Sequence, residues 1–328
     1  EANSYTLPNM QQISNTTSPD QPSSQFLLAL IASKCVFFLL GILGNVAVII
    51  CHACVNRDRT PSSYFVVNLA CADLVVCLAI YPTWISHFAL TIRSTMERIP
   101  GYMCQFSYVS GVLSIALSAL ALLVITYDRY IFISQPLHYF SIMTWKRTFT
   151  VLACVWVFTL VAIPPISLST KIVEKENSIC AYVSGGKVLL VIGFVDIPIA
   201  CTVYFNLKIF KIAREQTRRI ARMTNCGQND DLPWNTSRKR CAKEMRAVKT
   251  FSGVTGVLLC CYVPFSTMII LEHFVCNGCV PTKVHFLILE LIGINSVGNA
   301  YIYGLRHRQY RKGYGRILSV LSTCLFSG

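Results

Sequence analysis

The sequence predicts an all-α membrane protein, a bundle of seven transmembrane helices followed by a short amphipathic helix on the membrane surface. Seven apolar stretches divide the 328 residues, and each approaches the roughly 20 residues that a spanning helix needs. Charged residues make up only 13% of the chain, and the mean hydropathy is +0.53, whereas a soluble domain carries about 25% charged residues. The predicted spans are residues 26–53, 63–88, 102–127, 148–168, 187–210, 250–272 and 282–304.

These spans and their short connections leave no length for a separate soluble domain. We expect residues 1–25 to form an extracellular tail, residues 26–304 the transmembrane domain, and residues 305–328 the amphipathic helix with a cytoplasmic tail. The segment from Arg306 to Arg316 combines basic residues with an apolar face that includes Tyr310 and Tyr314. This combination is typical of a helix that lies on a membrane.

Lys and Arg residues predict the orientation, because cytoplasmic loops carry an excess of them. Most of the 29 lie in the loops after the first, third and fifth spans and in the C-terminal tail. The net charge of +14 therefore favours an inner membrane surface over nucleic acid. We expect a plasma-membrane protein with its N-terminus outside, where Asn15 in Asn15-Thr16-Thr17 is an accessible glycosylation acceptor. The basic residues on the outer side are Lys34, Arg93, Arg98, Lys171, Lys175, Lys187 and Lys283.

Among the charged residues within or at the end of spans, two groups stand out. An acid at the bilayer centre costs about 2.5–3.5 kcal/mol unless it faces the bundle interior with partners. Asp73 occupies the middle of the second span, and Asp128-Arg129-Tyr130 ends the third. A polar cluster that only holds the helices together is one interpretation of the residues around Asp73. Its candidate partners on the third and seventh spans are Ser114, Ser118, Asn295, Ser296 and Asn299.

The Asp128-Arg129-Tyr130 triplet at the end of the third of seven helices resembles the switch of rhodopsin-like (class A) G-protein-coupled receptors. In that family the arginine is held by the adjacent acid and by an acid at the foot of the sixth helix. Glu244 stands at that second position, 20 residues before Pro264. As an alternative, Glu244 is one more charge on a solvated basic helix. An arginine–carboxylate pair of this kind can bias a two-state movement of helices.

Further residues that resemble the family follow one another along the spans, and the resemblance covers about residues 26–320. It implies that Tyr262, Pro264, Asn299 and Tyr303 belong to the same switch. It also implies that the cluster around Asp73 binds an allosteric sodium ion, with no other metal or cofactor. The family's usual proline is replaced by Ala300, so we expect a straighter seventh helix. The other matching positions are Gly44, Asn45, Trp156, Pro165 and Pro198.

The resemblance also assigns the outer cysteines. It implies a disulfide between Cys104, at the top of the third span, and Cys180 in the second outer loop, on the oxidising side of the membrane. Cys276 and Cys279 can close a small ring in the third outer loop, as in some adenosine and amine receptors. A metal or redox Cys-x-x-Cys site needs a second ligand pair or a thioredoxin-like context, and the sequence contains neither.

The ligand class follows less directly. Amine receptors carry an acid seven residues after the third-span cysteine, where this chain has Gly111. Glu290 and Asp196 are the intramembrane acids that remain for a cationic ligand. Residues 299–314 resemble melatonin receptors, and residues 208–214 resemble amine receptors. An aromatic, mostly uncharged pocket suits a small, weakly polar ligand, although core packing would place aromatic residues at the same positions. The predicted lining is Trp84, Tyr108, Gly111, Tyr182, Phe194, Tyr262, Phe265, Ile269 and His285.

The implied function is a receptor that binds a small extracellular ligand in the bundle and activates a heterotrimeric G protein by outward movement of the sixth helix. Arrestin is a further expected partner. A secondary transporter, one alternative, would show inverted repeats and paired broken helices. A heptahelical hydrolase, the other, would need metal ligands or an activated nucleophile, yet no His-Glu-x-x-His or Gly-x-Ser-x-Gly motif occurs. The sequence favours a receptor that is not an enzyme.

Overall fold

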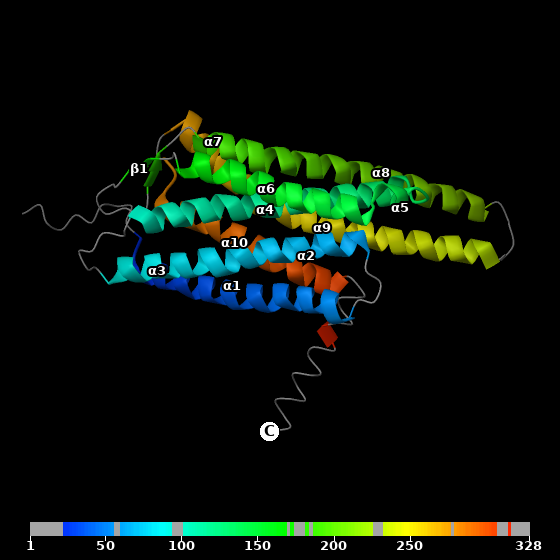
Figure 1. Ribbon diagram of the computed structural model, residues 1–328, viewed down its shortest axis with the longest axis horizontal. Helices are drawn as coiled ribbons and strands as arrows, with labels where there is room; N and C mark the ends of the chain where they lie inside the picture. Colours follow the sequence, from blue (N-terminus) through cyan, green and yellow to red (C-terminus); the bar gives the residue numbers. More distant parts are fainter. Residues whose placement is uncertain are drawn as a thin grey trace, which may run out of the picture.

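The computed structural model describes residues 22–55, 60–93, 101–168, 171–173, 181–183, 186–225, 232–276, 279–306 and 314–315. In these ranges seven helical segments are long and apolar enough to cross a membrane, which confirms the predicted all-α bundle. Figure 1 shows them side by side along the long axis of the molecule. The segments are Ser24–Cys54, Pro61–Ile92, Gly101–Ser134, Trp145–Leu168, Val188–Arg219, Gly253–Phe274 and Thr282–Ile302.

The bundle has two ends in Figure 1. We call the end at the right the α5 end and the opposite end the β1 end. The short helix α5 connects the third and fourth spans near the first of these ends. It is a feature that the hydropathy pattern did not predict. The elements are α1 (Ser24–Ile50), η1 (Cys51–Val55), α2 (Pro61–Val75), η2 (Val76–Ile80), α3 (Tyr81–Ile92), α4 (Gly101–Ser134), α5 (Tyr139–Ile142) and α6 (Trp145–Leu168).

The second half of the chain adds three long helices and one pair of strands. The strands are antiparallel, with Ile172 opposite Tyr182, and they add a small hairpin to the predicted all-helical fold. The last two described residues, Tyr314 and Gly315, belong to the predicted amphipathic segment, whose other residues lie outside the described ranges. The elements are β1 (Lys171–Val173), β2 (Ala181–Val183), α7 (Gly186–Val191), η3 (Ile192–Asp196), α8 (Ile197–Asn225), α9 (Leu232–Phe274) and α10 (Thr282–Arg306).

Helix α4 lies at the centre of the bundle, where it contacts α2, α6 and α8. Its buried face is built largely of small side chains, including Ser114, Ala116, Ser118 and Ala119. Small residues let helices approach closely in a membrane, where packing and hydrogen bonds hold helices together. Close approach also decides the contact between α1 and α10, since a Cβ atom added at Gly44 would lie 3.0 Å from that of Ala300.

Two of the wide, π-helical turns stand next to prolines. A proline ring clashes with the carbonyl group four residues earlier in a regular helix. For Pro82 that residue is Leu78, inside η2, and for Pro198 it is Phe194, inside η3. A π turn, which adds a residue to one turn of helix, relieves this clash. The prolines therefore account for the position of both turns.

Two helices are longer than the predicted spans. Helix α8 continues to Asn225, past the predicted end at residue 210, and α9 begins at Leu232, before the predicted start at residue 250. The added turns are rich in Lys and Arg. Hydropathy predicts the part of a helix that lies in the bilayer, and these polar turns extend beyond that part.

Candidate functional site

A buried acid, Asp128, organises the α5 end of the bundle. Its side chain is 1% exposed and accepts hydrogen bonds from three elements. Arg129 Nε on α4 donates to Oδ2 over 2.9 Å, Ser62 Oγ on α2 donates to the same oxygen over 2.7 Å, and Tyr139 Oη on α5 donates to Oδ1 over 2.7 Å. The carboxylate therefore joins α2, α4 and α5 at one point.

Tyr139 is the part of this network that lies outside the spans. Burial raises its pKa to about 12, and the negative charge of Asp128 acts in the same direction. The phenol therefore stays protonated at neutral pH and remains a donor to Asp128. Its ring packs edge-on against Phe132, 5.1 Å between ring centres, and the Arg129 guanidinium lies 5.3 Å from the same Phe132 ring. The arginine is thus held against α4.

The remaining predicted switch residues are only partly described. Tyr130 packs against Phe205 of α8, with 5.3 Å between ring centres. Glu244 lies in α9 and Tyr303 in α10, but both side chains lie outside the described part of the structure. The predicted pairing of Arg129 with Glu244 therefore stays a prediction.

Asp73 forms the centre of a second, deeper network. It is fully buried and accepts hydrogen bonds from Ser118 Oγ over 3.5 Å and from Asn299 Nδ2 over 3.1 Å. Asn295 Nδ2 donates to Ser118 Oγ over 3.3 Å and contacts Tyr262 Oη at 3.4 Å. Residues of four spans, distant in sequence, therefore meet at Asp73.

Three oxygen atoms of the residues predicted for this site are buried without a hydrogen-bond partner among the described residues: Ser114 Oγ, Asn295 Oδ1 and Asn299 Oδ1. Unpartnered buried oxygens beside a carboxylate are the ligands that a hard cation prefers. Ser296, the sixth residue predicted for this group, hydrogen-bonds elsewhere, with Tyr81 Oη at 2.8 Å and with the Gly293 carbonyl at 3.1 Å. The donor set thus fits a cation, with Ser296 turned away toward Tyr81.

A further ion pair, which sequence reasoning missed, joins α1 to α10 nearer the β1 end. Lys34 Nζ lies 2.7 Å from Glu290 Oε1, and the lysine is 5% exposed. Ser33 Oγ donates to Glu290 Oε2 over 2.9 Å. We had assigned Lys34 to the outer basic residues and Glu290 to a cationic ligand. Opposite charges inside two spans were the signal available, because such charges usually face each other in the bundle.

This ion pair lies beside a second set of polar contacts, which is centred on Tyr81 and Ser296. The ammonium group of Lys34 lies 5.7 Å from the centre of the Tyr81 ring. The Tyr81 hydroxyl contacts Ser296 Oγ, and Asn45 Nδ2 donates to the backbone carbonyl of Ser296 over 3.2 Å. Polar groups of α1, α3 and α10 therefore form one continuous set of contacts.

The residues predicted to line a ligand pocket lie on several elements, and the described ones do not form one cluster. Trp84 packs against Phe88 and Phe286 between α3 and α10, at 5.4 and 6.0 Å between ring centres, and His285 is the neighbour of Phe286. Phe194 stacks on Phe158 of α6. The positions on α9, which are Tyr262, Phe265 and Ile269, belong to the central core. Tyr108 and Gly111 lie on α4, and the side chain of Tyr182 lies outside the described residues.

The space beside Gly111 is open, because a Cβ atom built there meets no other atom within 4 Å. Asp196, at the end of η3, is half-buried, and Ser266 Oγ of α9 donates to its Oδ1 over 2.6 Å. The two intramembrane acids that sequence analysis offered to a ligand thus differ. Glu290 is neutralised by Lys34, whereas Asp196 is held by a neutral hydroxyl.

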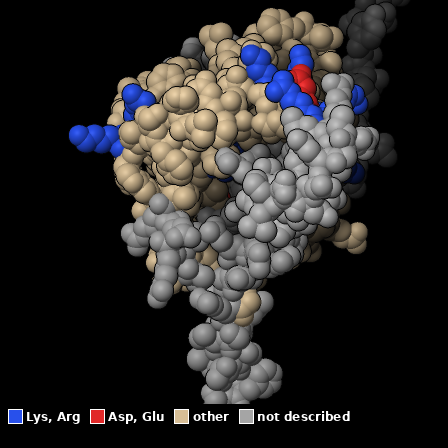
Figure 2. Space-filling view, turned by 90° about the vertical axis from the view of Figure 1, so that its right-hand side faces the viewer, with Lys and Arg blue, Asp and Glu red and all other residues tan. Residues whose placement is uncertain are grey.

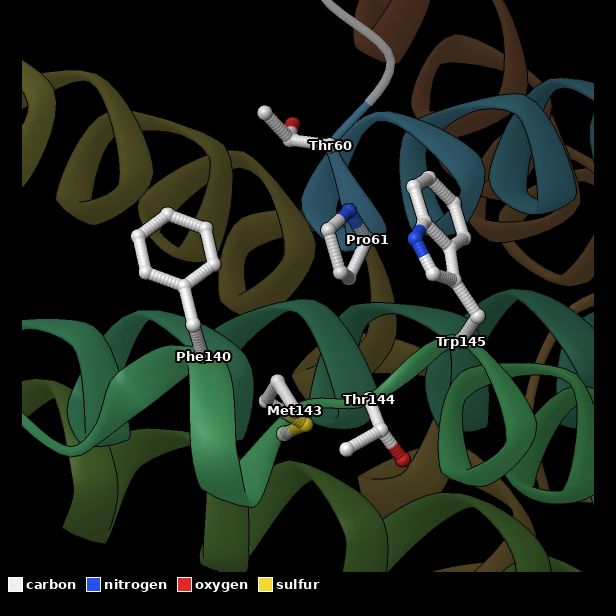
Figure 3. A pocket seen from close by; sticks show the side chains of 6 residues that line it. All are labelled: Thr60, Pro61, Phe140, Met143, Thr144 and Trp145. Atoms are coloured by element: carbon white, nitrogen blue, oxygen red, sulfur yellow. The ribbon is translucent and has the colours of Figure 1, made fainter.

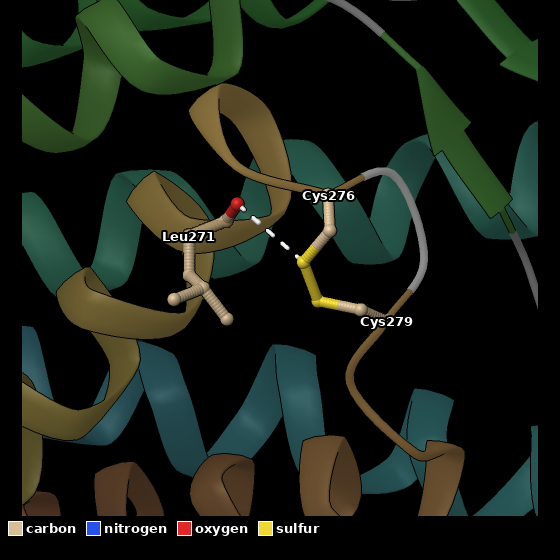
Figure 4. The surroundings of a disulfide bond; sticks show 3 residues. All are labelled: Leu271, Cys276 and Cys279. Carbon is tan, nitrogen blue, oxygen red and sulfur yellow. Dashed lines mark hydrogen bonds between the residues drawn. A yellow bond between two sulfur atoms is a disulfide. The ribbon is translucent and has the colours of Figure 1, made fainter.

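Disulfide bonds lie at the β1 end. One joins Cys276 to Cys279 between α9 and α10, with Cα atoms 5.6 Å apart, and the Cys276 sulfur lies 4.0 Å from the Leu271 carbonyl oxygen (Figure 4). Cys104 is also disulfide-bonded, and its expected partner Cys180 lies outside the described residues. The ring at Cys276 keeps the loop that leads into α10 close to the end of α9.

The chain is similar in sequence to membrane receptors. The family model described as "7 transmembrane receptor (rhodopsin family)" matches residues 44–303. The alpha-1A adrenergic receptor of Oryctolagus cuniculus is 26% identical over 349 residues, which cover 95% of this chain and 72% of that receptor. The Homo sapiens receptor of the same name is 26% identical over 354 residues, or 96% and 73%. That of Oryzias latipes is 25% identical over 312 residues, or 87% and 65%.

Proposed function

Because the chain belongs to the rhodopsin family of seven-transmembrane receptors, we propose that it binds a small extracellular molecule inside the bundle and activates a heterotrimeric G protein. The chain is a multi-pass plasma-membrane receptor and not an enzyme. The proposed signal is an outward movement of the sixth span, Gly253–Phe274, at the α5 end. Arrestin is a further proposed partner.

The observation that carries this proposal is the Asp128–Arg129 pair. The side chain of Asp128 is 1% exposed, whereas that of Arg129 is 16% exposed. The acid is anchored by Ser62 and Tyr139, which continue to donate to its carboxylate, so the more exposed arginine is the partner that can leave. A cation that is released beside the α5 end can then bind an incoming protein.

The surface next to this pair also suits a protein partner. Leu137, in the loop between α4 and α5, is 89% exposed, and Phe140 of α5 is 69% exposed. Large apolar side chains in a polar loop mark interaction sites. Together with Arg129, they offer an apolar and a positively charged contact, which is the combination that we assign to the G protein.

The proposed orientation places the N-terminus outside and the α5 end in the cytoplasm. The Cys276–Cys279 disulfide at the β1 end agrees with an oxidising outer side. Figure 2 views the opposite end, where Lys and Arg side chains lie around the rim. An excess of basic residues agrees with a cytoplasmic face. Asn15 remains a proposed glycosylation site on the outer side.

We assign sodium to the Asp73 network on the strength of its oxygen atoms. Asp73 would provide the charge, and Ser114, Ser118, Asn295 and Asn299 the neutral oxygens. Bound there, the ion neutralises a carboxylate that is otherwise surrounded by uncharged groups. Because the network joins α2, α4 and α10 through Tyr262 to α9, occupation of the site would favour the arrangement in which these helices stay together.

For the ligand we propose a small, weakly polar and uncharged molecule that occupies the space beside Gly111. Glycine supplies no counter-ion at this position, and Lys34 already neutralises Glu290. The residues of α9 predicted to line the pocket, Tyr262, Phe265 and Ile269, are aromatic or aliphatic, which suits such a ligand. A second candidate is a cationic amine. The similarity to adrenergic receptors favours it, and Asp196 is then the acid that would bind the ammonium group.

Replacement of the arginine tests the receptor function. Arg129→Ala should abolish nucleotide exchange on a panel of G proteins, measured at matched surface density. Lys283→Ala, which removes an exposed cation at the other end of the bundle, serves as the control and should couple normally. Full coupling by Arg129→Ala would contradict the proposal.

A pair of variants tests the ligand class. Gly111→Asp places a carboxylate in open space and should create a response to protonated amines that the parent protein lacks. If the natural ligand is an amine that binds Asp196, the parent protein responds to amines already and Asp196→Asn removes that response. A screen of small molecules on the three proteins, with cAMP and calcium as readouts, separates the two candidates.

A further inference from the structure

A hollow of about 370 Å³ lies at the α5 end, where the start of α2 meets α5 and the start of α6. Figure 3 shows Phe140 and Trp145 on opposite sides of Pro61, with Met143 and Thr144 beneath them. The residues that line the hollow are Thr60, Pro61, Phe140, Met143, Thr144 and Trp145. None of them belongs to the Asp73 network or to the proposed ligand pocket, and only Phe140 is shared with the surface that we assign to the G protein.

The hollow lies level with the edge of the membrane, because Trp145 is the first residue of the fourth span. Its indole ring is 44% exposed, and Phe149, one turn further into the span on the same face, is 51% exposed. Tyr64 of α2 packs edge-on against both rings, at 5.4 and 5.3 Å between ring centres. Tryptophan and tyrosine prefer the boundary between lipid and water. The apolar wall of the hollow therefore continues into a surface that faces lipid tails.

Two cations stand beside this wall. Lys146 and Arg147 are exposed and occupy the first turn of α6, next to Trp145. Arg147 Nη1 donates to the Ile142 carbonyl over 2.9 Å, and its backbone N–H donates to Thr144 Oγ1 over 3.4 Å. The first bond holds the guanidinium beside the turn that contains Met143 and Thr144, two residues that line the hollow. In the described part of the chain, neither cation forms an ion pair with an acid.

We propose that this hollow binds an anionic phospholipid of the cytoplasmic leaflet. An acyl chain would lie along Trp145 and Phe149, and the phosphate group would contact Lys146 and Arg147. Basic pockets between spans on the cytoplasmic side bind anionic headgroups, and the positive end of the α6 helix dipole adds to the attraction. A soluble protein would reach the cations but not the membrane-level wall. The inference depends on the orientation proposed above, not on the ligand or the G protein.

The test compares lipid binding by the full-length protein, purified in detergent without ligand or G protein. Native mass spectrometry measures bound phosphatidylserine against phosphatidylcholine with the same acyl chains. The double variant K146Q/R147Q should reduce the preference for phosphatidylserine by about tenfold or more, because it removes both cations that attract the anionic headgroup. The matched control R218Q/R219Q removes two exposed cations from α8, on the same side of the membrane, and should keep the preference.

Two further arms keep the result decisive. The conservative variant K146R/R147K keeps both charges and should bind like the parent protein, which separates loss of charge from loss of fold. Soluble glycerophosphoserine, which lacks acyl chains, should compete poorly. Equal loss in R218Q/R219Q would show that only total charge matters, retained preference in K146Q/R147Q would show that these cations are not used, and strong competition by glycerophosphoserine would assign a soluble anion. Each of these results overturns the proposal, while nucleotide exchange remains a separate test of the receptor function.

Discussion

Two ion pairs among the described residues differ in which partner is buried and in what they connect. Lys34 and Glu290 join helices at opposite ends of the sequence, and the lysine side chain, at 6% exposed, is the more buried of the two. Asp128 and Arg129 are neighbours on α4, and there the acid is the buried partner. Loss of the first pair would remove an interaction that joins α1 to α10. Loss of the second pair would release only the side chain of Arg129 from its neighbour on the same helix. The first pair is therefore suited to hold the fold and the second to switch.

The largest expected effect comes from breaking the pair that holds the fold. Lys34→Met leaves Glu290 buried without its cation, and removal of one partner from a buried pair costs about 3–5 kcal/mol. We expect a large loss of thermal stability and of surface expression. The double variant K34M/E290L removes both charges and should recover most of that stability. Equal stability of Lys34→Met and the parent protein would show that the pair carries no structural role.

The next effect concerns the pair assigned to switching. Asp128→Asn keeps an oxygen that can accept from Ser62 or Tyr139 but removes the charge that retains Arg129. Ligand-independent nucleotide exchange should rise, within the roughly 5–150-fold range of couplings of about 1–3 kcal/mol. K34M/E290L should leave exchange near the parent level at matched surface density. If both variants raise exchange equally, the proposed division between holding and switching is wrong.

A smaller effect is expected from the network between the two pairs. Replacing an impermeant organic cation with sodium should lower basal exchange by the parent protein, by about tenfold at most if the coupling lies at the low end of the usual range. Asp73→Asn removes the carboxylate and should abolish the response to sodium. An unchanged response would mean that the oxygens around Asp73 serve only to hold the helices together.

The smallest predicted effect is that of Tyr139→Phe. It removes one of the two hydroxyl donors that hold the Asp128 carboxylate when Arg129 leaves, so the balance should shift by about 1 kcal/mol toward the paired arginine and nucleotide exchange should fall. The pKa of Tyr139 is raised to about 12. The hydrogen bond from Tyr139 to Asp128 therefore stabilises the protein fully below about pH 10, the ordinary pKa of tyrosine. This stabilisation is lost as the pH rises through the raised pKa of Tyr139, about 12. The difference in exchange between parent and variant should be the same at pH 6 and pH 9, and a marked change over that interval would assign the titration to another group.

Residues inside the spans show how far sequence patterns could predict this molecule. The seven spans followed from apolar runs, because membrane insertion depends on local composition. The partners of Asp73 followed from the resemblance, and Ser118, Asn295 and Asn299 do lie with it. Ser296 hydrogen-bonds Tyr81 instead, since its position on α10 directs it toward α3. The rotation of a helix about its own axis decides where a side chain such as Ser296 points. This rotation depends on packing, which hydropathy does not describe.

The Lys34–Glu290 pair could not be assigned from sequence for a different reason. Lys34 lies near the outer end of its span, so it was counted by its side of the membrane, and Glu290 was assigned to a ligand. Which span neighbours which is decided by the bundle, and 256 residues separate the two. The π turns are the opposite case. Pro82 and Pro198 are visible in the sequence, and the clash that each proline creates four residues earlier was a signal that could have been used.

The π turn η3 also decides which structural templates suit this chain. Because such a turn contains one residue more than a regular turn, every side chain on its outer side is rotated by about 100° relative to an uninterrupted helix. Val188 and Leu190 are buried on that outer side, whereas Leu189 between them is 71% exposed. A homology model built by counting back from Pro198 on a template with a regular fifth helix would therefore place the wrong face of residues 186–191 toward the ligand. Docking into such a model would fail even if every residue were correctly identified.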